Sequence, residues 1–173
     1  MKNVVLVGFM GTGKTTVGAA LSEALGMTQI DLDEEIVRRE GKSIPALFAE
    51  QGEAYFRDAE SKYLADLLEQ GPCILTTGGG VVLRPQNVEV MVQKGLVVAL
   101  SASEEELIKR LENDTGRPLL AGGVAQRVRT LLAERAGAYD FAPIQIDTTG
   151  KSLTAIVEEI KGHLVENEAG GED

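Results

Sequence analysis

The stretch that most constrains the fold is an apolar, strand-like run that leads into a glycine-rich loop and then into a helix-like segment. Val4 to Val7 are continuously apolar, and the next residues, Gly8 to Thr15 (GFMGTGKT), match the pattern G-x-x-x-x-G-K-[ST] at every fixed position. An amphipathic pattern with helical spacing follows at once. This order of strand, loop and helix allows backbone N–H groups and a helix N-terminus to surround phosphate oxygens. The sequence therefore predicts a phosphate cradle, against the alternative of a glycine-rich turn with no chemical role.

Two side chains of this loop carry the expected chemistry. Lys14 would reach the β- and γ-phosphates of a nucleotide, and the hydroxyl of Thr15 would bind Mg²⁺. The other residues expected to contact the nucleotide are Gly11, Thr12, Gly13 and Thr16.

The rest of the chain alternates short apolar runs with helical patterns. Further strands are expected around Ile30 and over the runs Cys73–Thr76, Leu96–Leu100 and Ile144–Ile146. Most of these runs are continuously apolar, as in strands that are buried on both faces of a parallel sheet. Apolar residues at helical spacing mark three helices: Val17, Leu21, Ala24 and Leu25, ended by Gly26; Phe56, Ala59, Tyr63 and Leu67; and Leu153, Ile156, Val157, Ile160 and Leu164. The pattern predicts one α/β domain over residues 1–173, with helices on both faces of a parallel sheet.

Composition narrows the possible partners and the compartment. The formal net charge of -10 disfavours binding to nucleic acid or to an anionic membrane. Cys73 is the only cysteine, which rules out an internal disulfide, and we expect it to be a core residue in a reducing cytoplasm. No apolar run approaches the roughly 20 residues of a membrane span. The expected protein is cytoplasmic, with no nucleic acid or membrane partner.

Two carboxylates follow the second expected strand. Asp31 and Asp33 are two residues apart, so in a strand they would project from the same face at the edge where open α/β sheets bind ligands. Their expected roles are a ligand to metal-bound water and a partner of an acceptor hydroxyl group. The alternative for each is N-capping of the helix that follows.

Three successive glycines, Gly78, Gly79 and Gly80, follow the third expected strand directly. Glycine inside an element is costly, so we expect a close approach of backbone N–H groups to a ligand, with a sharp chain reversal as the alternative. Among the arginines, Arg57 has Glu60 as a helical neighbour, which allows an ordinary surface ion pair. Arg135 lies near a helix C-terminus, where interaction with the helix dipole is the alternative role.

Two segments break the pattern of strands and helices. The stretch from Asn113 to Gly123 is rich in turn-forming residues and is expected to be a mobile lid, assigned to residues 112–124. Within it, Arg117 is a candidate for contact with phosphate groups. The tail over residues 166–173 is expected to be disordered.

The whole set of motifs resembles the shikimate kinase family. GFMGTGKT, DLD, SIPALFAEQGEAYFRDAE, TTGGG, GRPLL and AERAGAY occur in that order along nearly the whole chain. The resemblance implies a nucleoside-monophosphate-kinase-like fold with a five-stranded parallel sheet. It also implies transfer of the γ-phosphoryl group of ATP to the 3-hydroxyl of shikimate, with Mg²⁺, in the biosynthesis of chorismate and aromatic amino acids. A monomer is expected.

The resemblance also implies roles for individual residues. The shikimate-binding region would cover residues 33–61, with further residues beyond it. Asp33 would contact the reacting hydroxyl, and Arg57 and Arg135 would bind the shikimate carboxylate. Gly78 to Gly80 would form one wall of the pocket, and Phe48 and Phe56 would form its apolar side. On the nucleotide side, Asp31 would lie in the water shell of Mg²⁺, Arg110 would stack on adenine, Arg117 would be the lid arginine, and Pro118 and Leu119 would cover the pocket. Lys14, Asp33 and Arg117 are the expected catalytic residues.

One segment departs from the family pattern, since residues 146–153 (IDTTGKSL) lack the usual proline after the last strand. Adenine as the base is thus expected from the resemblance alone. The alternative functions are another small-molecule kinase of this loop type, acting on gluconate or a nucleoside monophosphate, and a non-catalytic nucleotide-binding module.

Overall fold

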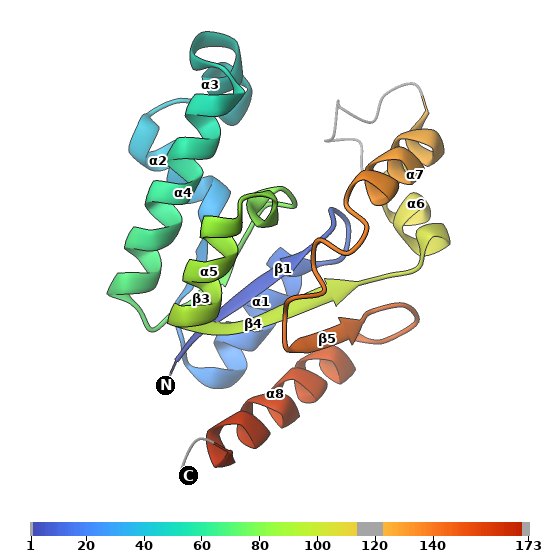
Figure 1. Cartoon of the computed structure of the whole chain (residues 1–173). Helices are drawn as coiled ribbons and strands as arrows, with labels where there is room; N and C mark the ends of the chain where they lie inside the picture. The colour runs from blue at the N-terminus through green and yellow to red at the C-terminus, as the bar shows by residue number, and fades with distance from the viewer. Residues whose placement is uncertain (1, 114–122, 171–173) are drawn as a thin grey trace.

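The computed structural model describes residues 2–113 and 123–170. Its centre is one parallel sheet in the order β2-β3-β1-β4-β5 (Figure 1). The strands are β1 (Asn3–Gly8), β2 (Gln29–Asp31), β3 (Ile74–Thr76), β4 (Gly95–Ser101) and β5 (Ile144–Asp147). All four neighbouring pairs are parallel, which confirms the five-stranded parallel sheet expected from the sequence.

Eight α-helices and one short 3₁₀ helix are seen within the described residues. They are α1 (Lys14–Leu25), α2 (Leu32–Glu40), α3 (Ile44–Gln51), α4 (Glu53–Gln70), η1 (Val81–Leu83), α5 (Pro85–Lys94), α6 (Glu104–Glu112), α7 (Val124–Glu134) and α8 (Leu153–Ala169). None of the helices in these residues is both long and apolar enough to cross a membrane.

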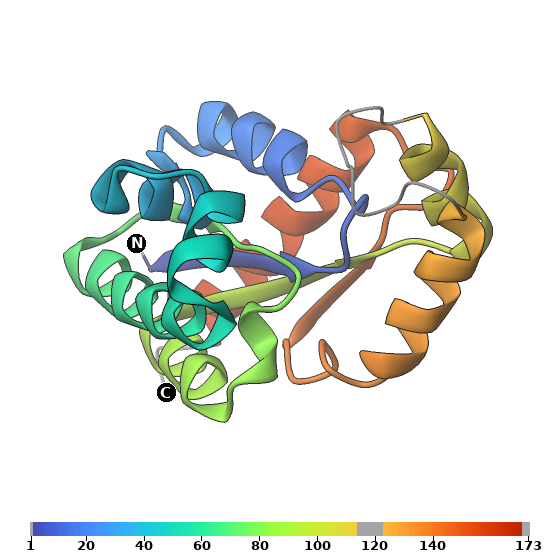
Figure 2. The same ribbon diagram turned by 90° about the horizontal axis from the view of Figure 1, so that it is seen from above.

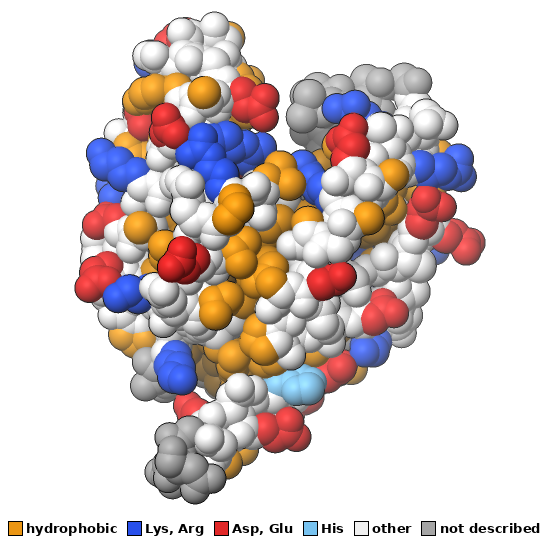
Figure 3. All heavy atoms as spheres, viewed as in Figure 1, with side chains coloured by type: hydrophobic (Ala, Val, Ile, Leu, Met, Phe, Trp, Pro, Cys, Tyr) orange, Lys and Arg blue, Asp and Glu red, His pale blue; other side chains and the backbone are white. Residues whose placement is uncertain are grey.

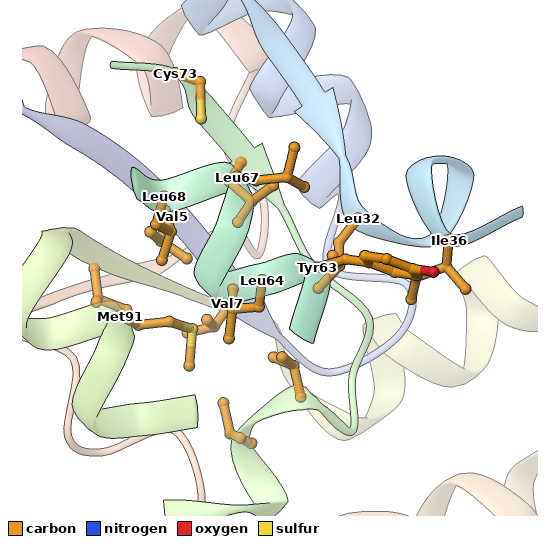
Figure 4. Packing of buried hydrophobic residues seen from close by; sticks show 14 of the residues in the cluster. Val5, Val7, Leu32, Ile36, Tyr63, Leu64, Leu67, Leu68, Cys73 and Met91 are labelled. Atoms are coloured by element: carbon orange, nitrogen blue, oxygen red, sulfur yellow. The ribbon is translucent and has the colours of Figure 1, made fainter. Parts of the chain in front are cut away.

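The two faces of the sheet are covered by different helices (Figure 2). Val5 and Val7 of β1 point into a core formed mainly with α2, α4 and α5, whereas Val4 and Leu6 point into a core formed with α1 and α8. Alternate residues of the same strand are therefore buried on opposite faces, which explains its continuously apolar sequence. Figure 4 shows the first core, in which Cys73 is buried as expected.

Side-chain caps fix the starts of four helices, of which α2 and α6 begin within three residues of the carboxyl end of a strand at one edge of the sheet. Asp31 caps α2, Ser43 caps α3, Ser103 caps α6 and Ser152 caps α8, each accepting a hydrogen bond from a backbone N–H of the first turn. At this edge a third apolar cluster, which includes Phe9, Leu107, Leu111 and Val128, packs α6 and α7 against the loop after β1. The surface is hollowed between two pairs of helices (Figure 3). One pair is α3 and the upper part of α4, and the other is α6 and α7 (Figure 1). Lys and Arg side chains gather at the base of the hollow.

The structure differs from the sequence-based expectation in three places. The expected tail begins too early, because α8 continues to Ala169 and residues 166–169 are helical; residues 171–173 lie outside the described part. Ala24 and Leu153, expected on apolar helix faces, are exposed. Asp33 is not in a strand, since β2 ends at Asp31 and α2 begins at the next residue.

Candidate active site

A cavity of about 430 Å³ lies at the carboxyl ends of β1, β2 and β3. This is the edge at which open parallel sheets bind ligands. The lining brings together residues of four separate segments: Met10, Gly11, Gly13, Lys14, Thr15 and Thr16; Asp31 and Asp33; Thr77, Gly78 and Gly79; and Arg110 and Leu111. The expected nucleotide-binding residues of the first segment therefore face one cavity, with the exception of Thr12.

The loop between β1 and α1 owes its shape to glycine. Gly8, Gly11 and Gly13 all have φ angles between 81° and 149°, a region that other residues rarely adopt. Gly8 also lies so close to β4 that a Cβ atom there would approach the carbonyl oxygen of Leu100 to 2.4 Å. Thr12 is buried and its hydroxyl donates to the carbonyl of Phe9 at 2.8 Å, so its side chain stabilises the loop and does not face the cavity.

The ammonium group of Lys14 lies within the loop itself. Its Nζ donates to the carbonyl oxygen of Gly8, and a second carbonyl, that of Phe9, lies at 3.2 Å. These carbonyls place the positive charge of Lys14 beside the N-terminus of α1, where binding of an anion is favoured. Phosphate oxygens entering the cavity would compete with uncharged carbonyl groups for this cation.

Arg110 connects the loop to the segment after β5. Its Nη1 donates to the carbonyl of Gly11 at 3.0 Å and to the hydroxyl of Thr148 at 3.2 Å. Arg110 also pairs with Glu106, four residues earlier on α6, with Nε 3.0 Å from Oε1. Arg110 thus lines the cavity while its guanidinium group joins two loops, and stacking on adenine stays a prediction.

Asp31 has the capping role that the sequence offered as the alternative, while its role as a ligand to metal-bound water stays a prediction. One carboxylate oxygen caps α2 by accepting from the N–H of Glu34 at 3.0 Å, and the other accepts from the hydroxyl of Thr76 at 2.9 Å. These two bonds fix the orientation of a carboxylate that lines the cavity.

The oxygen donors here are suited to Mg²⁺. The Thr15 hydroxyl and the Asp31 carboxylate both face the cavity. Within the part of the chain that the structure describes, no three His, Cys, Asp or Glu side chains cluster as a metal cage. Because Mg²⁺ usually keeps several waters and binds substrate phosphates with only one or two protein oxygens, these residues fit it.

Asp33 lies in the first turn of α2, so the argument that placed it in a strand was wrong, although the side chain does reach the cavity. Burial is the main cause that raises the pKa of Asp33, and the nearby Asp31 carboxylate adds to it, while Lys14 and Arg57 oppose the shift. A carboxylate whose charged form is disfavoured and that lies between two cations is suited to accept a hydrogen bond or a proton from an acceptor hydroxyl.

The three glycines after β3 each face a different functional side chain. A Cβ atom on Gly78 would lie 3.2 Å from a carboxylate oxygen of Asp33, one on Gly79 would lie 2.7 Å from Nη1 of Arg135, and one on Gly80 would lie 2.6 Å from Nη2 of Arg57. Their φ angles are not in the left-handed region, so a chain reversal does not require glycine here. The glycines are needed because Asp33, Arg135 and Arg57 occupy the space that their side chains would fill.

Arg57 forms an ion pair with a buried glutamate, Glu60. Its Nη1 lies 3.0 Å from Oε1 of Glu60, whose side chain is only 1% exposed, whereas the contact with Glu53 is longer, at 3.9 Å, and exposed. Burial is the largest cause that raises the pKa of Glu60, and Arg57 opposes the shift. The pair that the sequence suggested is therefore present, but it is buried on the Glu60 side and is not an ordinary surface pair.

Arg135 follows α7 as its C-terminal cap and turns its side chain toward Gly79. Its guanidinium carbon lies 5.8 Å from the centre of the Phe9 ring. The Nη1 atom is buried and has no hydrogen-bond partner among the described residues. Since a buried donor without a partner is costly, this cation is a candidate for contact with an anionic ligand.

Two aromatic rings lie on the acceptor side outside the cavity lining. Phe56 is buried and Phe48 is 37% exposed, and their ring centres are 4.9 Å apart. Contact of these two rings with a ligand stays a prediction. Arg117, Pro118 and Leu119, expected in the lid, lie outside the described residues.

The sequence analysis did not assign three residues that the structure brings into the site. Thr76 orients Asp31, Glu60 holds Arg57, and the hydroxyl of Tyr139 donates to the carbonyl of Gly79 at 2.7 Å. Glu60 and Tyr139 were both visible in the motifs that contain Arg57 and Arg135, at helical or near-helical spacing from those arginines. That spacing was the available signal.

Comparison with known proteins gives a consistent result. A family model described as shikimate kinase matches residues 10–165. A shikimate kinase from Geobacter metallireducens is 43% identical over 165 residues, covering 95% of this chain and 92% of that protein. One from Pelotomaculum thermopropionicum is 41% identical over 168 residues, covering 96% and 98%.

A solved structure of similar architecture is the shikimate kinase from Acinetobacter baumannii in complex with shikimate. It is 37% identical, with a TM-score of 0.88, over 96% of this chain and 94% of that chain. The fold, the family model and the full-length relatives agree, and the chain belongs to the shikimate kinase family.

Proposed function

We propose that the protein is an enzyme that transfers the γ-phosphoryl group of ATP to the 3-hydroxyl group of shikimate, giving shikimate 3-phosphate and ADP. The reaction belongs to the route to chorismate and aromatic amino acids. The observation that carries the proposal is the wall of Gly78, Gly79 and Gly80, which joins the phosphate cavity to Asp33, Arg135 and Arg57. Membership of the family and a relative solved in complex with shikimate support it.

The proposed reaction is a direct in-line transfer between two sites that share this wall. Because the transition state of phosphoryl transfer is loose, positioning and charge stabilisation contribute most of the catalysis. Lys14 would stabilise negative charge on the transferring group from the phosphate loop. Asp33 would orient the 3-hydroxyl group and accept its proton late in the transfer.

The carboxylate of shikimate would be bound by Arg57 and Arg135. Both guanidinium groups lie against the glycine wall, and the buried Nη1 of Arg135 lacks a partner among the described residues. Planar guanidinium groups suit a carboxylate because they can donate two parallel hydrogen bonds. Phe48 and Phe56 would contact the apolar side of the ring.

Thr15 and Asp31 would hold Mg²⁺, Thr15 through its hydroxyl and Asp31 through ordered water. When bound, the ion would neutralise charge on the β- and γ-phosphates. Gly11, Gly13 and Thr16 would surround the phosphates, and Arg110 would contact the adenine base.

Arg117 would contact ATP and the acceptor as part of a lid over residues 112–124, with Pro118 and Leu119 excluding water. Replacement of Arg117 by Ala is expected to lower kcat much more than it raises the KM for shikimate. An effect confined to KM would refute this role. We also propose a cytoplasmic monomer whose partners are its two small-molecule substrates.

The test is ADP release with Mg-ATP and one acceptor at a time: shikimate, gluconate or AMP. The proposal expects turnover with shikimate alone, and turnover about 10³-fold lower with the Lys14→Ala variant, which is the control for a contaminating kinase. Turnover with gluconate or AMP instead would support a different small-molecule kinase. Binding of ATP without turnover of any acceptor would support a non-catalytic module.

A further inference from the structure

We propose that Tyr139 is a positioning residue for the acceptor's carboxylate, and that its hydroxyl group acts by fixing Arg135 against Gly79. The inference rests on the proposed function and adds to it a residue and a way of acting. Tyr139 belongs to the turn that follows α7, four positions after Arg135, whereas Gly79 follows β3. The side chain therefore joins two parts of the chain that each contribute to the acceptor side.

The contacts of the hydroxyl group define its proton arrangement. It donates to the carbonyl oxygen of Gly79 at 2.7 Å, and it lies beside Arg135, since a Cβ atom on Gly79 would be 2.7 Å from Nη1 of Arg135 and 3.6 Å from the Tyr139 hydroxyl oxygen. A backbone carbonyl can only accept and a guanidinium group can only donate. Because the Tyr139 hydroxyl donates its proton to Gly79, its oxygen stays able to accept from the guanidinium group of Arg135 beside it, and we call this proposed link from Gly79 through Tyr139 to Arg135 the bridge.

The bridge is supported from the sheet side. The backbone carbonyl of Tyr139 accepts from the side-chain amide of Gln145 on β5 at 3.0 Å and from the N–H of Ala142 at 3.3 Å. The ring packs against two of the apolar clusters. Burial raises the pKa of the Tyr139 hydroxyl, with Arg135 opposing, so the proton that it donates to Gly79 stays in place at neutral pH.

Without the bridge, few contacts would hold the guanidinium group of Arg135. The Phe9 ring lies 5.8 Å from its central carbon, and the Nη1 atom has no hydrogen-bond partner in the described part of the chain. An arginine side chain that is free to rotate must be ordered when it binds a carboxylate, and that ordering weakens binding. By fixing this side chain beforehand, Tyr139 would strengthen binding of the acid without touching the reacting atoms.

The test compares Tyr139→Phe with the wild type in steady-state ADP release. Removing one hydrogen bond to a charged group is expected to raise the KM for shikimate about tenfold. The kcat and the KM for Mg-ATP should stay within about twofold of the wild type, because the bond is made in the ground state as well as in the transition state. Thermal unfolding of both proteins establishes that the variant is folded.

A matched control is Tyr63→Phe. Tyr63 also donates one hydrogen bond from a largely buried side chain, to Glu40 at 2.9 Å, but it lies between α4 and α2 and is not part of the cavity lining. Its removal should change the unfolding temperature without changing the KM for shikimate.

A second comparison isolates the carboxylate. The methyl ester of shikimate lacks the negative charge that Arg135 would bind, so wild-type kcat/KM should be lower for the ester, and Tyr139→Phe should cause no further loss with it. In a double-mutant cycle with Arg135→Lys, the combined loss for shikimate should be smaller than the product of the single losses.

The outcomes separate the two proposals. Absence of shikimate turnover by the wild type overturns the proposed function and this inference with it. If the wild type is active and Tyr139→Phe leaves the KM for shikimate unchanged, or weakens the acid and its ester equally, the positioning role of Tyr139 is overturned and the proposed function stands.

Discussion

The nucleotide side and the acceptor side of the site are built in different ways. The nucleotide side consists largely of one continuous loop, in which glycines with positive φ turn the backbone and Lys14 rests on loop carbonyls. The acceptor side consists of side chains from α2, α4 and the turn after α7, which meet at three glycines. Its two arginines lie beside Glu60 and Tyr139, which are outside the cavity lining.

This difference predicts which kinetic constant each side controls. Lys14 donates to two carbonyl oxygens of its own loop, and phosphate oxygens that enter the cavity would replace these bonds as the phosphoryl group moves. Arg57 is held by a buried carboxylate, and the proposed bridge through Tyr139 would hold Arg135, so both should be fixed before the acceptor arrives. Variants of the loop should act mainly on catalysis, and variants of the glycine wall and its partners should act mainly on the KM for shikimate.

The largest effect is expected for Lys14→Ala. The loss of the cation that stabilises the transferring group should lower kcat by about 10³-fold, as for other groups of this kind. Binding of shikimate alone, measured by titration calorimetry, should be unchanged because Lys14 is not one of the carboxylate-binding residues. Loss of shikimate binding in this variant would show that the two sides are not separate.

Asp33→Asn should lower kcat by about 100-fold while it stabilises the fold. Burial raises the pKa of Asp33, so the folded chain binds this proton more tightly than the unfolded chain does. This tighter proton binding adds to the free energy of unfolding, fully so at pH values below the pKa of Asp33 in the unfolded chain. The added stability is lost as the pH rises through the pKa of Asp33 in the folded chain. The amide of the Asp33→Asn variant does not titrate, so the variant does not lose this stability. Its free energy of unfolding should therefore exceed that of the wild type by more at about pH 8 than at about pH 4. Denaturant unfolding of both proteins at the two pH values measures it, and an equal difference at both would contradict the assignment.

Gly80→Ala and Gly79→Ala should each raise the KM for shikimate about tenfold, with the KM for Mg-ATP little changed. The added methyl group would displace the guanidinium end of Arg57 or Arg135, at 2.6 or 2.7 Å, and that end can move without unfolding the protein. Gly162→Ala is the matched control, because a Cβ atom there meets no atom within 4 Å. It should leave activity unchanged and stabilise α8 by up to about 1 kcal/mol. If all three variants had the same KM for shikimate, the proposal that Gly79 and Gly80 leave space for the arginine side chains would be wrong.

The smallest change is expected for Glu60→Gln. The amide keeps the shape of the side chain but weakens the bond to Arg57, so the KM for shikimate should rise about threefold. Glu53→Gln is the control on the same arginine, since the side chain of Glu53 is 70% exposed and its contact is 3.9 Å long. If both variants give the same KM, the buried position of Glu60 has no role in binding.

The same difference between the two sides explains what the sequence could and could not predict. The strands and the phosphate loop are encoded by contiguous residues, and the structure confirms the five-stranded parallel sheet. Asp33 was assigned by strand periodicity, which failed because the N-cap at Asp31 starts α2 at Leu32, two residues earlier than that argument allowed. Local pattern could not show whether the strand continued past the cap.

The acceptor side depends on contacts between residues far apart in the chain. Spacing showed that Glu60 could pair with Arg57, but its burial results from the packing of α4, which no local pattern reports. In the same way, the sequence predicted that the three glycines let a ligand approach the backbone, whereas the groups that lie against them in the structure are the side chains of Asp33, Arg135 and Arg57. The bridge by Tyr139 depends on the turn after α7 reaching the segment after β3.

The most direct test of the central claim is a crystal structure of this protein with shikimate bound. We expect the carboxylate of shikimate within hydrogen-bond distance of both Arg57 and Arg135, beside Gly79 and Gly80, with the 3-hydroxyl group directed at Asp33. A complex in which the acid binds elsewhere, or in which the two guanidinium groups face solvent away from it, would contradict the account.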